Sequence, residues 1–209
     1  MKAAVLRAPN FLEVGEIATP EAGPGELILA IKASTVCGTD LRILSGKKTK
    51  GVRFPSIIGH EFSGVVVETG SGVSGFKNGD RVCMDPVIPC RACNYCKAGL
   101  ENVCMNRQAM GYEFDGGFAE FVRIPAIALT SGNVFKMPNG MSFEAAALSE
   151  PLACCINGQK NAQVKLGDTV VILGAGPIGL MHAALARVAG ARQVIVSEPN
   201  SSRREAALK

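Results

Sequence analysis

The sequence of 209 residues predicts an α/β protein, with a mainly-β part followed by the first strand–helix–strand unit of a doubly wound parallel sheet. Up to about residue 130, short β-prone runs alternate with turns rich in Gly and Pro. From Ser142 onward, alanine-rich helical runs replace them. An apolar run, a glycine cluster, a helical run and a second apolar run then follow in order, which is the βαβ pattern.

Five runs in the first part are expected to form strands. In residues 27–33, apolar side chains recur at alternate positions, which is the period of a strand. The five runs are residues 1–6, 27–33, 64–68, 80–85 and 119–124. We place the domain boundary near residue 155, so that the two domains cover residues 1–155 and 156–209.

The second part is expected to begin with a helix whose amides the Ser142 side chain caps. A strand at 169–173, a helix at 178–189 and a strand at 193–196 follow. Because the two strands flank one helix, they should lie parallel in one sheet.

The composition excludes several classes of protein. A content of 47% hydrophobic and 19% charged residues is typical of a folded globular chain and not of a disordered one. The 22 basic and 18 acidic residues are spread along the sequence, so no nucleic-acid partner is expected. Without a secretory signal or a run of about 18 apolar residues, we expect a cytoplasmic protein with no membrane span. In that reducing compartment, the eight cysteines should be metal ligands or buried thiols.

Four cysteines lie close together in a lobe at residues 89–105. Four thiolates within fifteen residues can close a tetrahedron around Zn²⁺, and all-cysteine zinc sites are structural because no coordination position stays open. An iron–sulfur cluster is the alternative, but its bacterial pattern places the fourth cysteine nearer the third and follows it with Pro. The four candidate ligands are Cys90, Cys93, Cys96 and Cys104.

A second, dispersed set of candidate metal ligands consists of Cys37, His60 and Glu150. A catalytic zinc needs a few sulfur, nitrogen or carboxylate ligands and one exchangeable position. Taken singly, these residues are better explained as a buried thiol, a core histidine and a solvated acid, so the metal site depends on the pattern around them.

The surrounding motifs resemble the zinc-dependent medium-chain dehydrogenase/reductase family, which includes alcohol, sorbitol and threonine dehydrogenases. The resemblance implies a GroES-like catalytic domain over residues 1–155, structural zinc in the cysteine lobe, and catalytic zinc bound by Cys37, His60 and Glu61. The motifs are Cys37-Gly38-Thr39-Asp40, Gly59-His60-Glu61-Phe62-Ser63-Gly64, Gly79-Asp80-Arg81-Val82 and Asp115-Gly116-Gly117-Phe118-Ala119-Glu120, together with the lobe.

Glu150 matches the position at which the sorbitol- and threonine-dehydrogenase-like branches have glutamate. The resemblance therefore implies a polyol or amino-alcohol substrate. Whether Glu61, Glu150 or water completes the catalytic zinc shell stays open at this point.

The glycine cluster after the first apolar strand predicts a dinucleotide site. A Gly-x-Gly-x-x-Gly turn brings the pyrophosphate to a helix amino terminus, and an acid after the next strand binds the adenosine ribose. Glu198 would repel a 2′-phosphate, which favours NAD over NADP, although Arg203 and Arg204 lie nearby. The alternative is a glycine turn that serves only strand–helix packing. The candidate cofactor residues are Gly174, Gly176, Pro177, Ile178, Gly179, Glu198 and Arg203.

The expected reaction is reversible oxidation of a secondary alcohol to a ketone, using two Zn²⁺ per chain and NAD. Thr39 would relay the substrate proton toward solvent. Arg42, which stands where many relatives have histidine, suggests the alternative of a phosphorylated polyol. The remaining histidine, His182, is expected to serve packing, and Cys83, Cys154 and Cys155 are expected to be buried thiols.

The chain ends at Lys209, inside the helix expected after the second strand, whereas a doubly wound cofactor domain has six strands. We therefore expect a Rossmann domain cut short, and the alternative function is a zinc- and nucleotide-binding fragment without turnover. The resemblance implies homodimers or homotetramers of the full-length protein.

Overall fold

Antiparallel pairing dominates residues 1–149 of the computed structural model, which describes residues 1–208. A five-stranded sheet has the order β10-β6-β5-β3-β9, and its longest pair is β3 (Leu27–Thr35) with β5 (Glu61–Thr69). The other members are β6 (Arg81–Met84), β9 (Phe121–Ile124) and β10 (Val134–Lys136). A smaller sheet has the order β2-β1-β4, from β1 (Lys2–Ala8), β2 (Phe11–Glu16) and β4 (Ser56–Ile57). β7 (Val87–Ile88) pairs with β8 (Gln108–Ala109).

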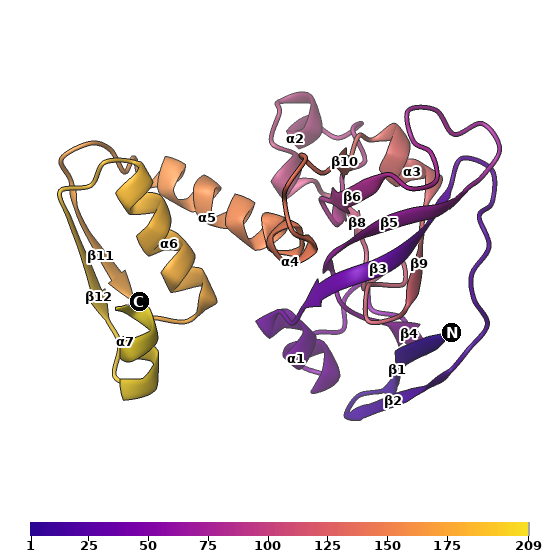
Figure 1. Ribbon diagram of the computed structural model, residues 1–209, viewed down its shortest axis with the longest axis horizontal. Coiled ribbons are helices and arrows are strands. Elements are labelled where there is room, and N and C mark those ends of the chain that lie inside the picture. Colours follow the sequence, from indigo (N-terminus) through magenta and orange to yellow (C-terminus); the bar gives the residue numbers. More distant parts are fainter. Residues whose placement is uncertain (209) are drawn as a thin grey trace. The chain divides into compact units, whose positions relative to one another are not determined.

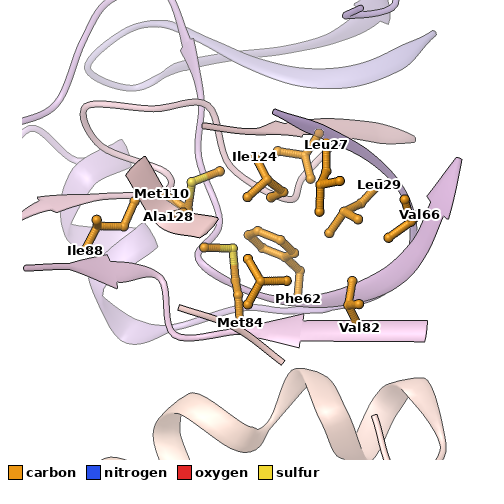
Figure 2. Close-up of a cluster of buried hydrophobic side chains, with 12 residues drawn as sticks. Leu27, Leu29, Phe62, Val66, Val82, Met84, Ile88, Met110, Ile124 and Ala128 are labelled. Atoms are coloured by element: carbon orange, nitrogen blue, oxygen red, sulfur yellow. The ribbon is translucent and has the colours of Figure 1, made fainter. Parts of the chain in front are cut away.

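The main core lies on one face of the five-stranded sheet, and Phe62 stands at its centre (Figure 2). Leu27 and Leu29 of β3 point into it, as alternation predicts. Ile28 is also buried. On the face of the sheet opposite Phe62, α4 (Phe143–Ala147) packs against β3 and β5. Ser63 Oγ donates a hydrogen bond of 2.7 Å to the Phe143 carbonyl and so ties α4 to the sheet. Both faces of the sheet are therefore covered at its centre.

Short helices connect the strands of this unit. α1 (Gly38–Leu44) follows β3, α2 (Asn94–Lys97) and a 3-10 turn at Glu101–Val103 form the cysteine lobe, and α3 (Ala126–Thr130) follows β9. Ser142 caps α4, as predicted, by accepting a hydrogen bond from the Ala145 amide at 3.1 Å.

The second unit, which runs from Glu150, is a βαβ arrangement (Figure 1). β11 (Thr169–Leu173) pairs in parallel with β12 (Gln193–Ser197), and α6 (Pro177–Val188) connects them and packs against both. α5 (Ser149–Asn161) contacts α6 through a 2.7 Å hydrogen bond from Gln159 Nε2 to the His182 carbonyl. α7 (Ser201–Ala207) follows β12.

The predicted fold class is confirmed, with a mainly-β first part and a parallel βαβ unit after it. The predicted strands all occur, but the sequence reading missed β2, β4, β7, β8 and β10. The predicted boundary at residue 155 falls inside α5, whereas the two compact units separate after Ser149. Because α5 is one continuous helix, a domain boundary near its first residue does not divide the helix between two domains. None of the helices formed by residues 1–208 has the length and apolar character needed to cross a bilayer.

Asp80 closes the turn that precedes β6. Its Oδ2 accepts a 3.0 Å hydrogen bond from the Lys77 amide and lies 2.9 Å from Lys136 Nζ. These two partners hold the pKa of the Asp80 carboxyl below its ordinary value of 3.8. Since the folded state binds this proton less readily than the unfolded chain, the stabilisation is present above about pH 4 and is lost as pH falls further.

We expect Asp80→Asn to lower the melting temperature by a few degrees at pH 7, and by progressively less as the pH falls below about 4. Thermal melts followed by circular dichroism across this range would measure the difference. A difference of the same size at every pH would contradict the assignment.

Candidate functional site

The candidate active site lies where the end of β3 meets the start of β5. Thr35 pairs with Glu61 in the antiparallel ladder, Cys37 follows two residues after Thr35, and His60 immediately precedes β5. One ligand atom from each of Cys37, His60 and Glu61 lies within 4.8 Å of the others. His60 and Glu61 are buried, and Cys37 is half-buried. The structure thus brings together the three residues that the resemblance implied.

A glycine-rich segment supports the backbone beside His60. Gly59 adopts a φ of +93°, which favours glycine, and a side chain there would come within 2.6 Å of the Phe118 ring. The Gly117 amide donates to the Gly59 carbonyl at 2.9 Å. A side chain at Gly116 would overlap that same carbonyl. The motif at residues 115–120, which the sequence offered only as part of a resemblance, therefore permits a close backbone approach behind the histidine.

Asp40 is a buried carboxylate that joins the two ligand-bearing segments. Its Oδ2 accepts a 2.9 Å hydrogen bond from the Cys37 amide, and its Oδ1 lies 3.4 Å from His60 Nδ1. A carboxylate beside Nδ1 would leave Nε2 as the nitrogen available to a metal ion. The sequence reading gave Asp40 no role, although the capping pattern after Cys37 was visible in it.

The neighbours of Cys37 and Glu61 are polar. Thr39 donates backbone and side-chain hydrogen bonds to Cys37, while burial and the charges of Glu61 and Asp40 raise the pKa of the Cys37 thiol above 9.0. Thr35 Oγ1 donates to Glu61 Oε2. A cation placed among these groups would offset the unfavourable burial of negative charge.

Glu150 is not part of this group of three. It lies in the first turn of α5, within the second unit, where Cys154 Sγ contacts Glu150 Oε1 at 3.4 Å. The prediction that Cys154 is buried was wrong, because its side chain is exposed, whereas Cys155 is buried and Cys83 is half-buried.

The four cysteines of the lobe form a second group, with their sulfur atoms within 4.8 Å of one another. Cys93 Sγ lies 3.6 Å from that of Cys96 and 3.9 Å from that of Cys104, and the Cys90 amide donates to Cys104 Sγ at 3.3 Å. These distances suit ligands that share one ion.

Backbone amides prepare the lobe for metal binding. Hydrogen bonds from the amides of Cys96 and Met105 lower the pKa of Cys93 to about 6. Burial raises the pKa of Cys96 above its ordinary value of 9.0. A lowered pKa favours the thiolate, which is the form of cysteine that binds a metal ion, and a bound ion would also deprotonate the other thiols.

The glycine cluster forms the turn between β11 and α6. Gly174 has a φ of +102°, and a side chain at Gly179 would overlap the Gly174 carbonyl, so helix and strand approach closely. Gly176 precedes α6 without a side-chain cap, and Pro177 occupies the first helical turn. Residue 176 therefore provides no side-chain cap for the first backbone amides of α6. Uncapped amides at the start of a helix can bind a phosphate group. Ile178 lies in this same first turn.

Glu198 follows β12 but is turned toward the glycine turn. Its Oε2 accepts from the Ala175 amide at 2.8 Å and its Oε1 from the Asn200 amide at 2.9 Å. These hydrogen bonds, with Arg203 and Arg204 nearby, lower the pKa of the Glu198 carboxyl, which is buried. Beyond its predicted ribose role, Glu198 therefore has a structural one.

The other basic residues named in the sequence analysis lie on helices or beside them. Arg203 is exposed on α7, while Arg204 Nη1 donates to the Glu198 carbonyl at 2.8 Å. Arg42 is exposed on α1. His182 lies within α6 and outside both metal-ligand groups.

Comparisons with known proteins agree with this geometry. The family model of the alcohol dehydrogenase GroES-like domain matches residues 23–139. Over 199 residues the chain is 41% identical to an L-threonine 3-dehydrogenase of Pyrococcus furiosus, which covers 94% of this chain and 56% of the relative.

Two solved structures are also similar. One, described as a zinc-binding dehydrogenase from Sinorhizobium meliloti bound to NADP, is 40% identical with a TM-score of 0.91, covering 99% of this chain and 58% of that one. The other is galactitol-1-phosphate dehydrogenase from Escherichia coli, 32% identical with a TM-score of 0.88, covering 100% of this chain and 58% of that one.

The chain belongs to the zinc-dependent medium-chain dehydrogenase family, and its mainly-β unit contains the GroES-like domain of that family. It spans somewhat more than half the length of the relatives that it matches.

Asp40 should tune metal affinity without binding the metal. Because it orients His60 and the Cys37 amide, we expect Asp40→Ala to weaken zinc binding at the Cys37 group by about 10- to 100-fold. Competition with a chromophoric chelator would measure the affinity. Asp168→Ala is the matched control, since Asp168 caps the Lys165 amide at 2.9 Å in a similar turn of the second unit. Equal losses in both variants would contradict the role of Asp40.

Proposed function

We propose that this chain carries the zinc-binding part of a dehydrogenase that reversibly oxidises a secondary alcohol or polyol to a ketone with NAD. The observation that carries this proposal is the convergence of Cys37, His60 and Glu61 within 4.8 Å. A thiolate, an imidazole and a carboxylate are a donor set that Zn²⁺ accepts, and three ligands leave one tetrahedral position for substrate. The relatives named for threonine and galactitol 1-phosphate support a substrate with a hydroxyl group.

The ligand roles follow from the local contacts. Zinc held here would lower the pKa of a bound hydroxyl and stabilise the alkoxide. Cys37 would bind through its sulfur and His60 through Nε2, because Asp40 holds Nδ1. Glu61 is the carboxylate within reach of both, which supports it as the third ligand, with Glu150 or water as the alternative.

Thr39 is the group proposed to carry the substrate proton. Its side chain donates to the Cys37 sulfur, and it is half-buried beside the ligand group. A hydroxyl at this place can accept a proton from a bound alcohol and pass another to water. The catalytic residues of the proposal are thus Cys37, Thr39, His60, Glu61 and Glu150.

The βαβ unit is proposed to bind the adenosine half of NAD, and the nicotinamide of NAD would accept the hydride. The turn at 174–179 would hold the pyrophosphate through the first amides of α6. Glu198 supports NAD over NADP because the negative charge of a carboxylate at this position disfavours a 2′-phosphate. Arg203 is the exposed cation that would bind the 2′-phosphate if NADP were the cofactor instead.

The cysteine lobe is proposed to hold a second, structural zinc ion. Four sulfur ligands satisfy a tetrahedral ion and leave no position for substrate. The stoichiometry would then be two zinc ions per chain. Such a protein would act on a small molecule in the cytoplasm, and the family resemblance supports homodimers or homotetramers of the natural protein.

Zinc content and turnover together test the proposal. We expect two zinc ions per chain in the natural protein, and about one in Cys37→Ser, which should lose turnover on a polyol panel with NAD. Cys93→Ser should lose the other ion and melt at a lower temperature, since structural zinc contributes directly to folding. Cys83→Ser, outside both groups, is the control and should keep both ions.

Full turnover in Cys37→Ser would refute the catalytic assignment. A natural protein with two zinc ions and no turnover on any substrate would instead be a zinc- and nucleotide-binding protein without activity.

Cofactor preference depends in this proposal on the charge of Glu198. We expect Glu198→Gln, which removes the negative charge and keeps an oxygen for only one of the two backbone amides, to lower the ratio of kcat/KM for NAD to that for NADP by about tenfold. Steady-state kinetics with both cofactors would measure it. Glu205→Gln, an exposed charge removed from α7, should leave the ratio unchanged. A natural preference for NADP would overturn this part of the proposal.

A further inference from the structure

The segment between two of the proposed zinc ligands is strongly cationic. Residues 41–60 contain five basic side chains and no acidic one, although the whole chain has 22 basic and 18 acidic residues. The near balance of the whole sequence conceals this concentration. The five residues are Arg42, Lys47, Lys48, Lys50 and Arg53.

The fold keeps this segment beside the candidate active site. It begins in α1, directly after Cys37, and ends at His60. The Lys48 amide donates to the Arg42 carbonyl at 3.1 Å, so the loop folds back on α1. Val52 and Tyr112 pack against the same small core cluster, which includes Ile43 and Ile58. The loop is therefore held at both ends and at its middle.

Lys48 is the cation that reaches toward the zinc ligands. Its Nζ lies 5.4 Å from the centre of the Tyr112 ring, and that ring lies 5.8 Å from the His60 ring at an angle of 52°. A cation–π contact restricts where the ammonium group can be. Lys48 is half-buried, whereas Lys47 and Lys50 are exposed. One aromatic ring thus separates a positioned ammonium group from a proposed zinc ligand.

Most of these charges are not paired with acids in the described part of the chain. Arg53 forms an ion pair with Asp115 at 2.8 Å, but none of the other four basic residues has a carboxylate partner among residues 1–208. Like charges gathered without counter-ions cost free energy, which a bound anion would offset. The segment therefore has the character of an anion-binding loop.

We propose that Lys48, assisted by Arg42, binds a phosphate monoester group on the substrate, at the end remote from the hydroxyl that is oxidised. This inference rests on the proposed function and adds its substrate class. A dianionic phosphate attracts several basic groups more strongly than a single carboxylate does, and Arg42, whose carbonyl accepts the Lys48 amide, belongs to the same folded-back segment and carries a guanidinium that can bind phosphate in a bidentate way. The preferred substrate is then a phosphorylated polyol.

The test compares galactitol, galactitol 1-phosphate and galactonate as substrates of the natural protein with NAD. We expect kcat/KM to be highest for the phosphate ester. Lys48→Gln should lower the ratio of kcat/KM for galactitol 1-phosphate to that for galactitol by about tenfold, and Arg42→Gln should lower it in the same direction. Lys48→Arg should retain most of the preference, because the positive charge remains. Calorimetric titration with galactitol 1-phosphate should show the same order of binding affinity.

Lys77→Gln is the matched control, since it removes an exposed lysine from a turn of the same unit and should not change the ratio. Zinc content measured on each variant shows that the site itself is intact. Turnover on all three compounds without a phosphate preference, a preference for galactonate, or a ratio unaffected by Lys48→Gln would overturn this inference alone. Absence of turnover on every compound, with two zinc ions bound, would overturn the proposed function, and calorimetry would then decide whether Lys48 binds the phosphate ester.

Discussion

The antiparallel pairing of β3 with β5 is the interaction on which the first unit depends. Its register sets Thr35 opposite Glu61, which brings Cys37 beyond the end of one strand next to His60 before the start of the other. The same register turns Phe62 into the main core (Figure 2). A slip of one residue would move Phe62 to the opposite face of the sheet. Core packing and the ligand group are therefore fixed by a single choice of register.

Three carboxylates in this protein accept hydrogen bonds from backbone amides close to the candidate sites. Asp40 accepts from the Cys37 amide, Glu198 from the Ala175 amide and Asp115 from the Ile57 amide. Each of these amides lies in or beside a segment that carries candidate ligands or the glycine turn. Such contacts preorganise a site because they restrict the backbone before a ligand arrives.

Periodic and motif-bearing features were predictable from the sequence, whereas features that depend on close tertiary approach were not. The alternation in β3 and the Ser142 cap are local and were found. The two-residue strands β4, β7 and β8 are too short to show a period. The orientation of Glu198 and the contact between Asp40 and His60 depend on partners distant in the chain. The basic residues between positions 42 and 53 can be counted in the sequence, but only the structure shows that Lys48 lies against Tyr112.

The two metal-ligand groups also differ in the length of chain that contains their ligands and the residues that support them. The four cysteines lie within fifteen consecutive residues, so that group is complete once residue 104 has left the ribosome. The Cys37 group needs the sheet and the supporting segment at 115–118 as well. During synthesis, the four cysteines of the lobe are therefore all available before the segment that supports the Cys37 group has been made.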